Sequence, residues 1–323
     1  MNNPKMSIVS PVYGAATLLE ELVNQIQASV SHITDEFEII LVEDSSPDNS
    51  WDIIKSLSAM NSRIKGIKLS RNFGQQSALN AGLDYASGDW IVTLDCDLQD
   101  DPIYIQQLYQ KGLEGYDIVF ACRQNRKDSW IKKICSKLFY NFLSYLTETN
   151  QDSRIANYVL YKKNVIDAMK QLGDYCRYYP MINRWVGFNV FKLEIEHSKR
   201  MDNIKSSYSI SKRFKLAYET IITFSDKPLR LVLQFGITLV LLALVVAVIL
   251  TLRYFIIGAN VRGWISVFVS IWLLSGITIA ILGLVSAYLG KMFETVKHRP
   301  TYIVMNKTNL KSPSFPSVPI GNP

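Results

Sequence analysis

Short apolar runs alternate with amphipathic stretches over residues 1–125 of the chain. Runs of four to seven mainly apolar residues are typical of buried strands, and they occupy residues 6–12, 37–42, 66–69, 90–94 and 117–121. Between them, apolar side chains recur at helical spacing in residues 17–30, 49–60, 75–86 and 102–112. Strands that alternate with helices of this length predict βαβ units and an α/β fold with a largely parallel sheet.

The last third of the chain has a different pattern. Residues 231–252 and 264–289 are runs of 22 and 26 residues without a charge, and about 20 apolar residues suffice to span a bilayer. We therefore expect a two-helix transmembrane hairpin over residues 229–290. More lysines and arginines flank the two ends of the hairpin than lie in its connecting loop, so both chain ends are expected on the cytoplasmic side. Residues 291–323 form a cytoplasmic tail, and its part after Arg299, rich in Pro, Ser and Asn, is expected to be poorly ordered.

Two basic amphipathic segments precede the hairpin, at residues 129–146 and 207–228. Each carries large apolar side chains on one face and lysines or arginines elsewhere, which is typical of helices that lie in the membrane interface. An ordinary surface helix packed on the sheet would show the same amphipathicity. The predicted organisation is a catalytic domain over residues 1–206, containing the first of these helices, followed by the second helix, the hairpin and the tail.

Composition excludes several functional classes. The four cysteines lack paired metal-ligand spacing, and only three histidines are present, so zinc chemistry based on these residues is not expected. The net charge of +7 suits nucleic acid, anionic lipid or acidic substrates. Because no nucleic-acid-binding motif accompanies the charge, we favour a membrane surface and phosphate groups as partners.

The candidate chemistry is concentrated in residues 91–102, IVTLDCDLQDDP, where an apolar strand ends in acidic residues. Asp95 and Asp97 are two residues apart, so on an extended chain their side chains point the same way. Paired carboxylates suit Mg²⁺ or Mn²⁺, which take their remaining ligands from water and substrate phosphates. Ligands of α/β sheets bind at the carboxyl ends of the strands, where this pair lies. The alternative is an acidic surface turn, since turns favour Asp.

The first two predicted strands also end in polar clusters, the first at residues 10–13 and the second at residues 42–48. Asp44 directly follows the second strand, where a carboxylate can accept hydrogen bonds from a base or a ribose. Asp48, four residues later, either shares this role or caps the following helix. The chain contains neither G-x-x-x-x-G-K-[ST] nor G-x-G-x-x-G, which argues against a P-loop ATPase and a dinucleotide-dependent dehydrogenase. A nucleotide whose diphosphate is neutralised by a metal fits better.

Three blocks, VEDSSPDNS (42–50), RNFGQQSALNAGL (71–83) and LDCDLQDDP (94–102), resemble the signature motifs of family 2 glycosyltransferases. The resemblance is to the membrane-anchored branch that loads sugars onto polyprenyl phosphates, which includes dolichyl-phosphate mannose synthase and undecaprenyl-phosphate glycosyltransferases. It implies a GT-A fold, a Rossmann-like domain that binds a nucleotide-sugar donor, commonly a UDP-sugar in bacteria. By this resemblance the nucleotide-binding residues are Pro11, Tyr13, Asp44 and Arg71. The catalytic and metal-binding residues are Asp95, Asp97 and Gln99.

The sequence departs from the family pattern in three places. Gly14 and Ala15 stand where Asn-Glu is usual, and residues 156–160 replace G-D-F-R-L, without its acid and arginine. Residues 200–208 form a longer version of the R-x-x-G-x-S-K-Y block, with Ile204 where glycine is expected. These differences concern the sugar and the acceptor and leave the donor-binding blocks intact.

The resulting hypothesis is an inverting glycosyltransferase of the bacterial cytoplasmic membrane that transfers a sugar from a nucleotide-sugar to undecaprenyl phosphate. The attacking phosphate is largely ionised at neutral pH, so no strong base is needed and Asn157 can replace the family's acid. Basic and hydroxyl side chains would hold the lipid phosphate. These candidates are Arg123, Arg126, Lys132, Lys133, Ser136 and Arg200. Each could instead be a solvated surface charge or a lipid-headgroup contact.

Two alternatives remain open. A hydroxyl acceptor on a lipid-linked glycan would need a base, for which Asp152 is the available carboxylate. A nucleotide-binding membrane scaffold without activity would not require the Asp95 and Asp97 pair. In each case the two-span hairpin is expected to pack against copies of itself in a homo-oligomer.

Overall fold

The computed structural model describes residues 5–123, 145–146, 155–172, 185–195, 221–222, 225–257, 263–297 and 299–310. The chain forms two compact units. The α/β unit contains Met1–Ile134, Asp152–Ser207 and Arg299–Pro323, and the helical unit contains Cys135–Gln151 and Tyr208–His298. The α/β unit therefore includes the C-terminal segment, which the sequence pattern assigned to a separate tail.

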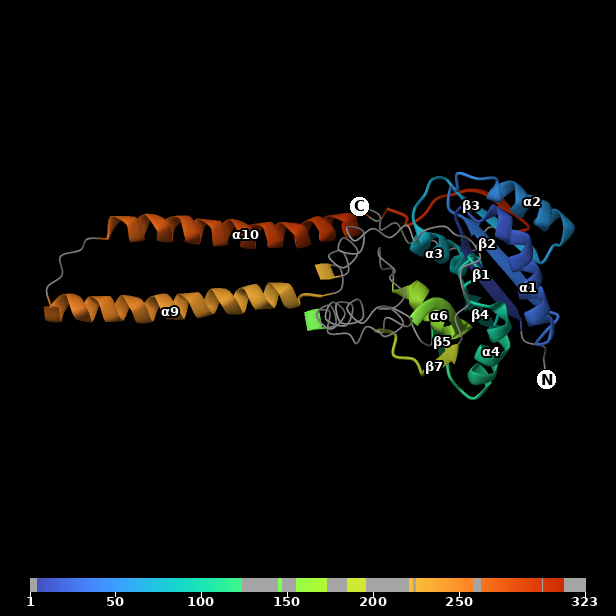
Figure 1. Ribbon diagram of the computed structural model, residues 1–323, viewed down its shortest axis with the longest axis horizontal. Helices are drawn as coiled ribbons and strands as arrows, with labels where there is room; N and C mark the ends of the chain where they lie inside the picture. Colours follow the sequence, from blue (N-terminus) through green and yellow to red (C-terminus); the bar gives the residue numbers. More distant parts are fainter. Residues whose placement is uncertain are drawn as a thin grey trace, which may run out of the picture. The chain divides into compact units, whose positions relative to one another are not determined.

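One mixed sheet forms the centre of the α/β unit (Figure 1). Its strands are β1 (Met6–Val12), β2 (Phe37–Glu43), β3 (Ile64–Leu69), β4 (Trp90–Thr93), β5 (Ile118–Arg123), β6 (Ile155–Lys162), β7 (Val190–Ile195) and β8 (Val304–Thr308). Their order across the sheet is β7-β5-β6-β4-β1-β2-β3-β8. The central strands β3, β2, β1 and β4 are parallel, whereas β6 runs antiparallel to β4 and β5, and β8 runs antiparallel to β3.

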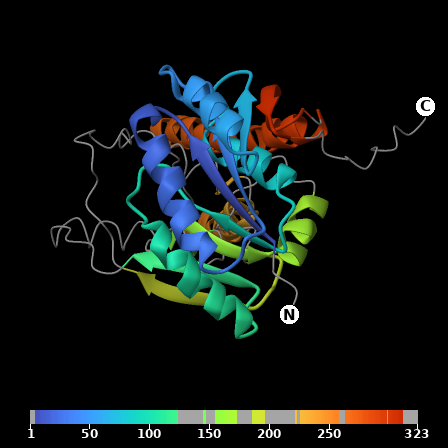
Figure 2. The same cartoon turned by 90° about the vertical axis from the view of Figure 1, so that its right-hand side faces the viewer.

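Helices cover both faces of this sheet (Figure 2). They are η1 (Ala16–Leu18), α1 (Leu19–Ser31), α2 (Ser50–Met60), α3 (Gln75–Tyr85), η2 (Pro102–Tyr104), α4 (Ile105–Leu113) and α6 (Lys163–Gln171). Alternate residues of β1 point to opposite faces: Ile8 joins the apolar cluster under α1, α2 and α4, and Val9 joins the cluster under α3 and α6. Helix α3 packs closely on β1 at Gly82. A side chain at this position would clash, since a Cβ atom there would lie 2.2 Å from Val9 Cγ1.

The five predicted strands and four predicted helices of residues 1–125 are confirmed, with small shifts at their ends. Strands β6, β7 and β8 were not predicted. The expectation that the tail is poorly ordered is wrong over Val304–Thr308, because this segment pairs with β3 from Gly66 to Leu69. A short polar strand carries no periodic signal of its own, and its conformation depends on a partner far away in sequence.

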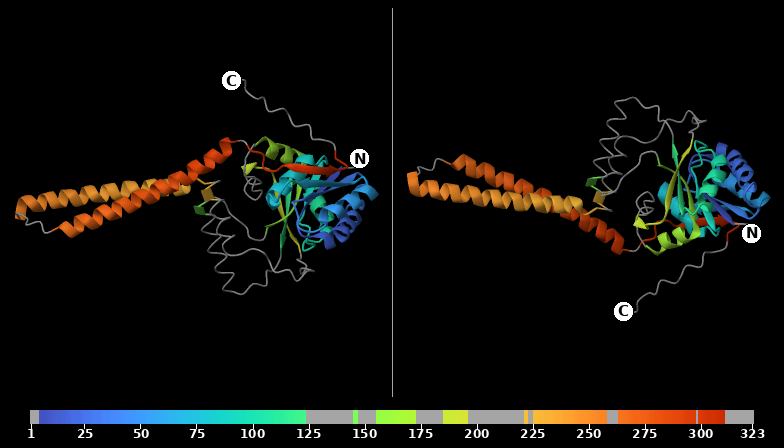
Figure 3. Two further views of the ribbon diagram at one scale, coloured as in Figure 1. Left: turned by 90° about the horizontal axis from the view of Figure 1, so that it is seen from above. Right: turned by 90° about the horizontal axis from the view of Figure 1, so that it is seen from below.

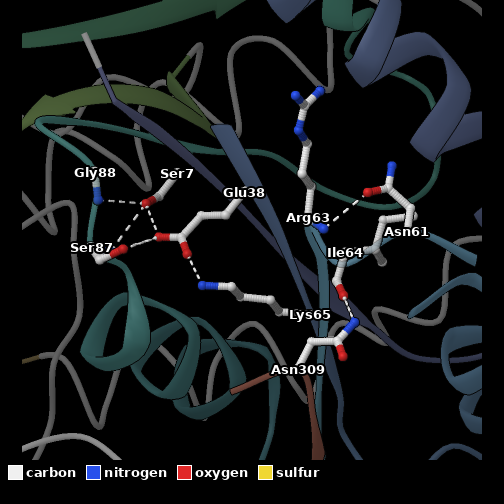
Figure 4. A network of polar contacts seen from close by, with 9 residues as sticks. All are labelled: Ser7, Glu38, Asn61, Arg63, Ile64, Lys65, Ser87, Gly88 and Asn309. Atoms are coloured by element: carbon white, nitrogen blue, oxygen red, sulfur yellow. Dashed lines mark hydrogen bonds and ion pairs between the residues drawn. The ribbon is translucent and has the colours of Figure 1, made fainter. Parts of the chain in front are cut away.

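A network of polar groups around the buried Ser7 and Glu38 lies at the amino end of the parallel strands (Figure 4). Glu38 Oε1 accepts hydrogen bonds from Ser7 Oγ at 2.5 Å and from the backbone N–H and Oγ of Ser87, each at 2.8 Å. Its other oxygen is paired with Lys65 Nζ. Burial alone would raise the pKa of Glu38, but Lys65 and the serine hydrogen bonds outweigh it, and the pKa is lowered.

Two long helices dominate the helical unit, α9 (Lys227–Ile257) and α10 (Trp264–Val296), shown from two sides in Figure 3. They contain the two predicted spans. Among the described residues, the segment Ser270–Val296 of α10 is long and apolar enough to cross a membrane. The predicted interfacial helices, 129–146 and 207–228, lie mostly outside the described residues.

Polar contacts fix the start of α9 within the helical unit. Lys227 Nζ lies 3.7 Å from the centre of the Tyr145 ring and donates to the Tyr145 carbonyl at 2.9 Å. Ser225 Oγ donates to the Leu146 carbonyl, and the Ser225 carbonyl accepts from Tyr288 Oη at 2.8 Å. The residues before α9 are thereby joined both to the end of the first basic segment and to α10.

Candidate functional site

The candidate site lies at the carboxyl end of β1, β2 and β4. These strands are neighbours and parallel, so the loops that follow them meet at one end of the sheet. Pro11 lies within β1, near its carboxyl end, and the other donor-binding candidates from the sequence lie on these loops or on the loop after β3. The sheet thus brings together three motif blocks, the first and last of which are separated by 43 residues in the sequence.

Asp44 organises the loop of residues 70–74. Its side chain is buried, and its two carboxylate oxygens accept the backbone N–H groups of Phe73 at 2.7 Å and Gly74 at 2.8 Å. Gly74 has φ +93°, a conformation that favours glycine. Burial raises the pKa of Asp44 above its usual value, although the two hydrogen bonds counteract this. A carboxylate can accept further hydrogen bonds, so contact with a nucleoside is compatible with this role.

Asp48 joins the loop after β1 to the loop after β2. Its carboxylate accepts the backbone N–H of Ala16 at 3.0 Å, Ser46 Oγ at 2.6 Å and Ser50 Oγ at 2.6 Å. The backbone N–H of Gly14 donates to Ser46 Oγ at 2.7 Å. Burial would raise the pKa of Asp48, but the hydrogen bonds outweigh it and hold the pKa at about 2. Asp48 also accepts the backbone N–H of Ser50, the first residue of α2, at 3.2 Å, while Asn49 occupies the N-cap position. Asp48 therefore connects the two loops beside the start of α2.

The Gly14-Ala15 departure therefore falls within this connection. Gly14 has φ +65°, and Ser45, on the facing loop, has φ +52°. Both positions adopt the left-handed region, which Gly tolerates without strain and Ser does not. The turn at Ser45 is closed by a hydrogen bond from Ser46 N–H to Glu43 Oε1.

Glu43 is a site residue that the sequence reasoning missed. It is 1% exposed, and burial raises its pKa. Glu43 Oε2 has no hydrogen-bond partner among the described residues and lies 4.0 Å from Lys68 Nζ. The signal available in the sequence was its place at the last position of β2, directly before Asp44.

Asp95 is held by two amide side chains from other elements. Its Oδ1 accepts Gln75 Nε2 at 2.7 Å, from the start of α3, and Asn157 Nδ2 at 3.3 Å, from β6. Asn157 reaches Asp95 because β6 runs antiparallel to β4, with Thr93 opposite Val159. The residue that stands in place of the family's acid is thus a neighbour of the aspartate pair. Gln75 was not among the predicted site residues, although it lies in the RNFGQQ block.

The four aspartates of the acidic loop divide into two groups. Asp95 and Asp97 are partly exposed, and Asp97 Oδ1 accepts the backbone N–H of Gln99 at 3.2 Å. Asp100 is buried, and Asp101 caps η2 by accepting the Ile103 backbone N–H at 2.9 Å. The first pair is available to a ligand, while the second belongs to the fold.

Cys96 lies between the paired aspartates. Burial raises the pKa of Cys96 to about 12, so the thiol stays protonated at neutral pH. Among the described residues, no cluster of three or more His, Cys, Asp or Glu side chains surrounds a point that could hold a metal. Mg²⁺ in phosphate-transfer sites is commonly held by one or two carboxylates together with waters and substrate phosphates, and the Asp95 and Asp97 pair fits this donor set.

The remaining predicted residues have different surroundings. Tyr13 is 55% exposed, whereas Pro11 is buried within β1. The Arg71 guanidinium lies over the Phe73 ring, 4.6 Å from its centre, on the loop that Asp44 holds. Arg123 is the last residue of β5, and its side chain is not described. The other lipid-phosphate candidates lie outside the described residues: Arg126, Lys132, Lys133, Ser136 and Arg200.

Comparisons with known proteins agree with this arrangement. The glycosyltransferase YkcC of Bacillus subtilis is 34% identical over 95% of this chain and 95% of its own. The undecaprenyl-phosphate 4-deoxy-4-formamido-L-arabinose transferases of Aeromonas hydrophila and Proteus mirabilis are 30% and 31% identical, over 94% and 96% of this chain and 95% and 96% of theirs.

A solved structure shows the same fold. Glucosyl-3-phosphoglycerate synthase from Mycobacterium tuberculosis, crystallised with Mn²⁺, UDP-glucose and phosphoglyceric acid, aligns with a TM-score of 0.50 at 14% identity. The alignment covers 69% of this chain and 79% of that one. A sequence profile described as "Glycosyl transferase family 2" matches residues 7–170, which contain every aspartate of the site. The chain belongs to glycosyl transferase family 2.

Proposed function

We propose that the protein transfers a sugar, with inversion, from a UDP-sugar to undecaprenyl phosphate at the cytoplasmic face of a bacterial membrane, in a metal-dependent reaction. The observation that carries this proposal is the pair of partly exposed carboxylates at the carboxyl end of β4, Asp95 and Asp97, next to the loops ordered by Asp44 and Asp48. A buried polar framework that leaves two acidic side chains accessible suits the binding of a charged ligand.

Asp95, Asp97 and Gln99 would hold Mg²⁺ or Mn²⁺. When bound, the metal would act as a Lewis acid that stabilises the departing nucleotide diphosphate. Gln75 and Asn157 keep the Asp95 carboxylate oriented by donating to its Oδ1. Two amide donors also stabilise the ionised form of a carboxylate, which is the form that binds a metal.

The nucleoside would bind against the loops after β1, β2 and β3. Tyr13 offers an exposed ring and Asp44 an ordered acceptor, while Arg71 offers a cation beside them in the β3 loop. The nucleophile would be a phosphate oxygen, which is largely ionised at neutral pH and needs no strong base. This explains how Asn157 can occupy a position at which a base would otherwise be expected.

The acceptor class is supported by the relatives. Two of them carry names that state undecaprenyl phosphate as the acceptor, and each covers at least 94% of this chain, including the long helices. We propose that α9 and α10 both span the membrane, that both chain ends are cytoplasmic and that the hairpins pack in a homo-oligomer. The lipid phosphate would be held by Arg123, Arg126, Lys132, Lys133, Ser136 and Arg200.

The test is transfer of radiolabelled sugar from a panel of UDP-, GDP- and dTDP-sugars to undecaprenyl phosphate, using the full chain in detergent with Mg²⁺ or Mn²⁺. We expect a chloroform-soluble product from a UDP-sugar that is absent with EDTA or with Asp97→Ala. Asp52→Ala, which removes an exposed carboxylate on α2, is the matched control and should retain activity. Undecaprenol, which lacks the phosphate, should not be glycosylated.

Two results would contradict the proposal in different ways. Binding of a nucleotide-sugar without any lipid product would favour a glycan hydroxyl as acceptor. Absence of nucleotide binding would favour a membrane scaffold. The configuration of the product at the anomeric carbon, read from its NMR coupling constant, tests inversion separately.

A further inference from the structure

We propose that residues 302–309, here called the C-terminal brace, position the loop of residues 70–74 for nucleotide binding. This inference rests on the proposed function, because it takes the carboxyl end of the sheet to be the donor site. The brace follows both long helices in the sequence, yet it belongs to the α/β unit. The donor site would therefore be incomplete without residues from beyond the hairpin.

The brace contacts the loop where the loop begins. Val304 lies opposite Leu69 in the β3–β8 pair, and the backbone N–H of Ser70 donates to the Ile303 carbonyl at 2.9 Å. Three residues later, the N–H groups of Phe73 and Gly74 reach Asp44. The loop is thus held at one end by the brace and at the other by Asp44.

A second contact connects the brace to the helix after the loop. Tyr302 Oη donates to Asp84 Oδ2 on α3 at 2.9 Å. Helix α3 begins at Gln75, whose side chain donates to Asp95. The side chains of Tyr302 and Val304 also pack against the same apolar cluster as Phe73. The brace therefore supports both elements that approach the aspartates.

The far end of the brace is fixed to β3 and α2. Thr308 Oγ1 accepts the Gly66 backbone N–H at 3.0 Å and donates to Ser58 Oγ at 2.9 Å. Asn309 Nδ2 donates to the carbonyls of Ser58 at 2.6 Å and Ile64 at 2.9 Å, the latter visible in Figure 4. These contacts set the register of β8 against Gly66–Lys68. The register shifts between Lys68 and Leu69, and this shift places Val304 opposite Leu69, directly before Ser70.

A loop that follows an edge strand can open locally at low cost, and its ordering opposes ligand binding. By covering β3, the brace makes it an interior strand and limits the motion of residues 70–74. We expect nucleotide affinity to depend on the brace even at temperatures where the protein is fully folded.

The experiment compares two truncations of the full chain in detergent, one lacking residues 311–323 and one lacking residues 301–323. UDP binding is measured by calorimetry with Mn²⁺, together with the unfolding temperature. The shorter truncation should bind UDP like the full chain, and the longer one should bind at least about tenfold more weakly. A synthetic peptide of residues 299–310 should restore binding to the longer truncation. Equal UDP affinity of both truncated chains would overturn the inference.

If the longer truncation does not fold, point variants test whether the C-terminal brace supports UDP binding. Tyr302→Phe and Asp84→Ala should each raise the UDP dissociation constant about three- to tenfold, as expected for one lost hydrogen bond, and the double variant should add nothing further. Asp84→Asn keeps the acceptor and should bind UDP normally. Asn306→Ala, which changes an exposed side chain of β8, is the control. Lower unfolding temperatures with unchanged UDP affinity would show a purely structural role, whereas failure of the full chain to bind UDP would contradict the proposed function instead.

Discussion

The two ends of the central sheet use buried carboxylates in opposite ways. At the amino end, Glu38 has partners for both of its oxygens, and its pKa is lowered. At the carboxyl end, Glu43 and Asp44 are equally buried, but burial raises the pKa of each. Glu38 is paired with Ser7, Ser87 and Lys65, so we assign this network to the fold.

At the carboxyl end, some carboxylate oxygens are not fully paired within the protein or are open to solvent. Glu43 Oε2 has no hydrogen-bond partner among the described residues, and Asp95 and Asp97 remain partly exposed. Functional sites commonly retain such unfavourable groups, because a ligand can supply what the protein does not. The comparison predicts that mutations at the two ends will separate activity from stability.

The largest effect is expected for Asp95→Asn. The amide oxygen can still accept from Gln75 and Asn157, so the fold should persist, but the negative charge is lost. Sugar transfer should fall roughly 10²- to 10³-fold or more, with an unchanged free energy of unfolding. Asp101→Asn is the matched control in the same loop, because Asn caps a helix as well as Asp does. Similar activity in both variants would contradict a functional role for the Asp95 carboxylate at the carboxyl end.

The reverse outcome is expected for Glu38→Gln. It leaves Lys65, which is 22% exposed, without its charge partner, and should lower the free energy of unfolding by about 3 kcal/mol. Chemical denaturation measures this change. Activity per folded molecule at low temperature should stay within about twofold of the wild type, because no substrate contact is altered. A large loss of activity with normal stability would contradict the assignment of this end to the fold.

Asp48→Ala should have an intermediate effect on both properties. It removes the acceptor for Ala16, Ser46 and Ser50, so the free energy of unfolding should fall by about 1 kcal/mol. The KM for the donor should rise severalfold, because the loops after β1 and β2 are no longer joined. In the wild type the folded pKa of about 2 lies below the usual 3.8. The stability from Asp48 is therefore present above pH 3.8 and is lost as the pH falls towards 2, and Asp48→Ala should lack this dependence.

The sequence was sufficient to predict the strands of the parallel core, because each of them is a buried apolar run. Strand β1 was predicted at its observed bounds, and the aspartate pair was placed correctly at the end of β4. Strand β7 has the sequence VFKLEI and lies at the edge of the sheet, and β8 has the sequence VMNKT. Neither is an uninterrupted apolar run, so their pairing depends on the rest of the fold and could not be read locally.

The contacts within the site could not be predicted from the sequence either. Motif spacing indicated that Asp44 follows a strand, but not that it binds the backbone of residues 73 and 74, because the approach of one loop to another is set by tertiary packing. Asn157 was noted as a departure from the family pattern. That it donates to Asp95 follows only from the antiparallel insertion of β6 between β4 and β5.

The smallest effect is expected for Glu43→Gln, which tests how a buried carboxylate at the carboxyl end affects the free energy of unfolding. The folded pKa of Glu43 lies above its unfolded value, so its ionisation favours the unfolded state, and its contribution to stability rises as the pH falls through the folded pKa. Replacing it with Gln keeps an acceptor for Ser46 N–H and removes the buried charge. At pH 7 the variant should be as stable as the wild type or slightly more so, by less than about 1 kcal/mol. Denaturation at pH 7 and pH 4.5 should show that the wild type gains relative to the variant on acidification, opposite in sign to the same comparison for Glu38→Gln. A loss of several kcal/mol at pH 7 would mean that Glu43 is as well satisfied as Glu38, and the contrast between the two ends would no longer hold.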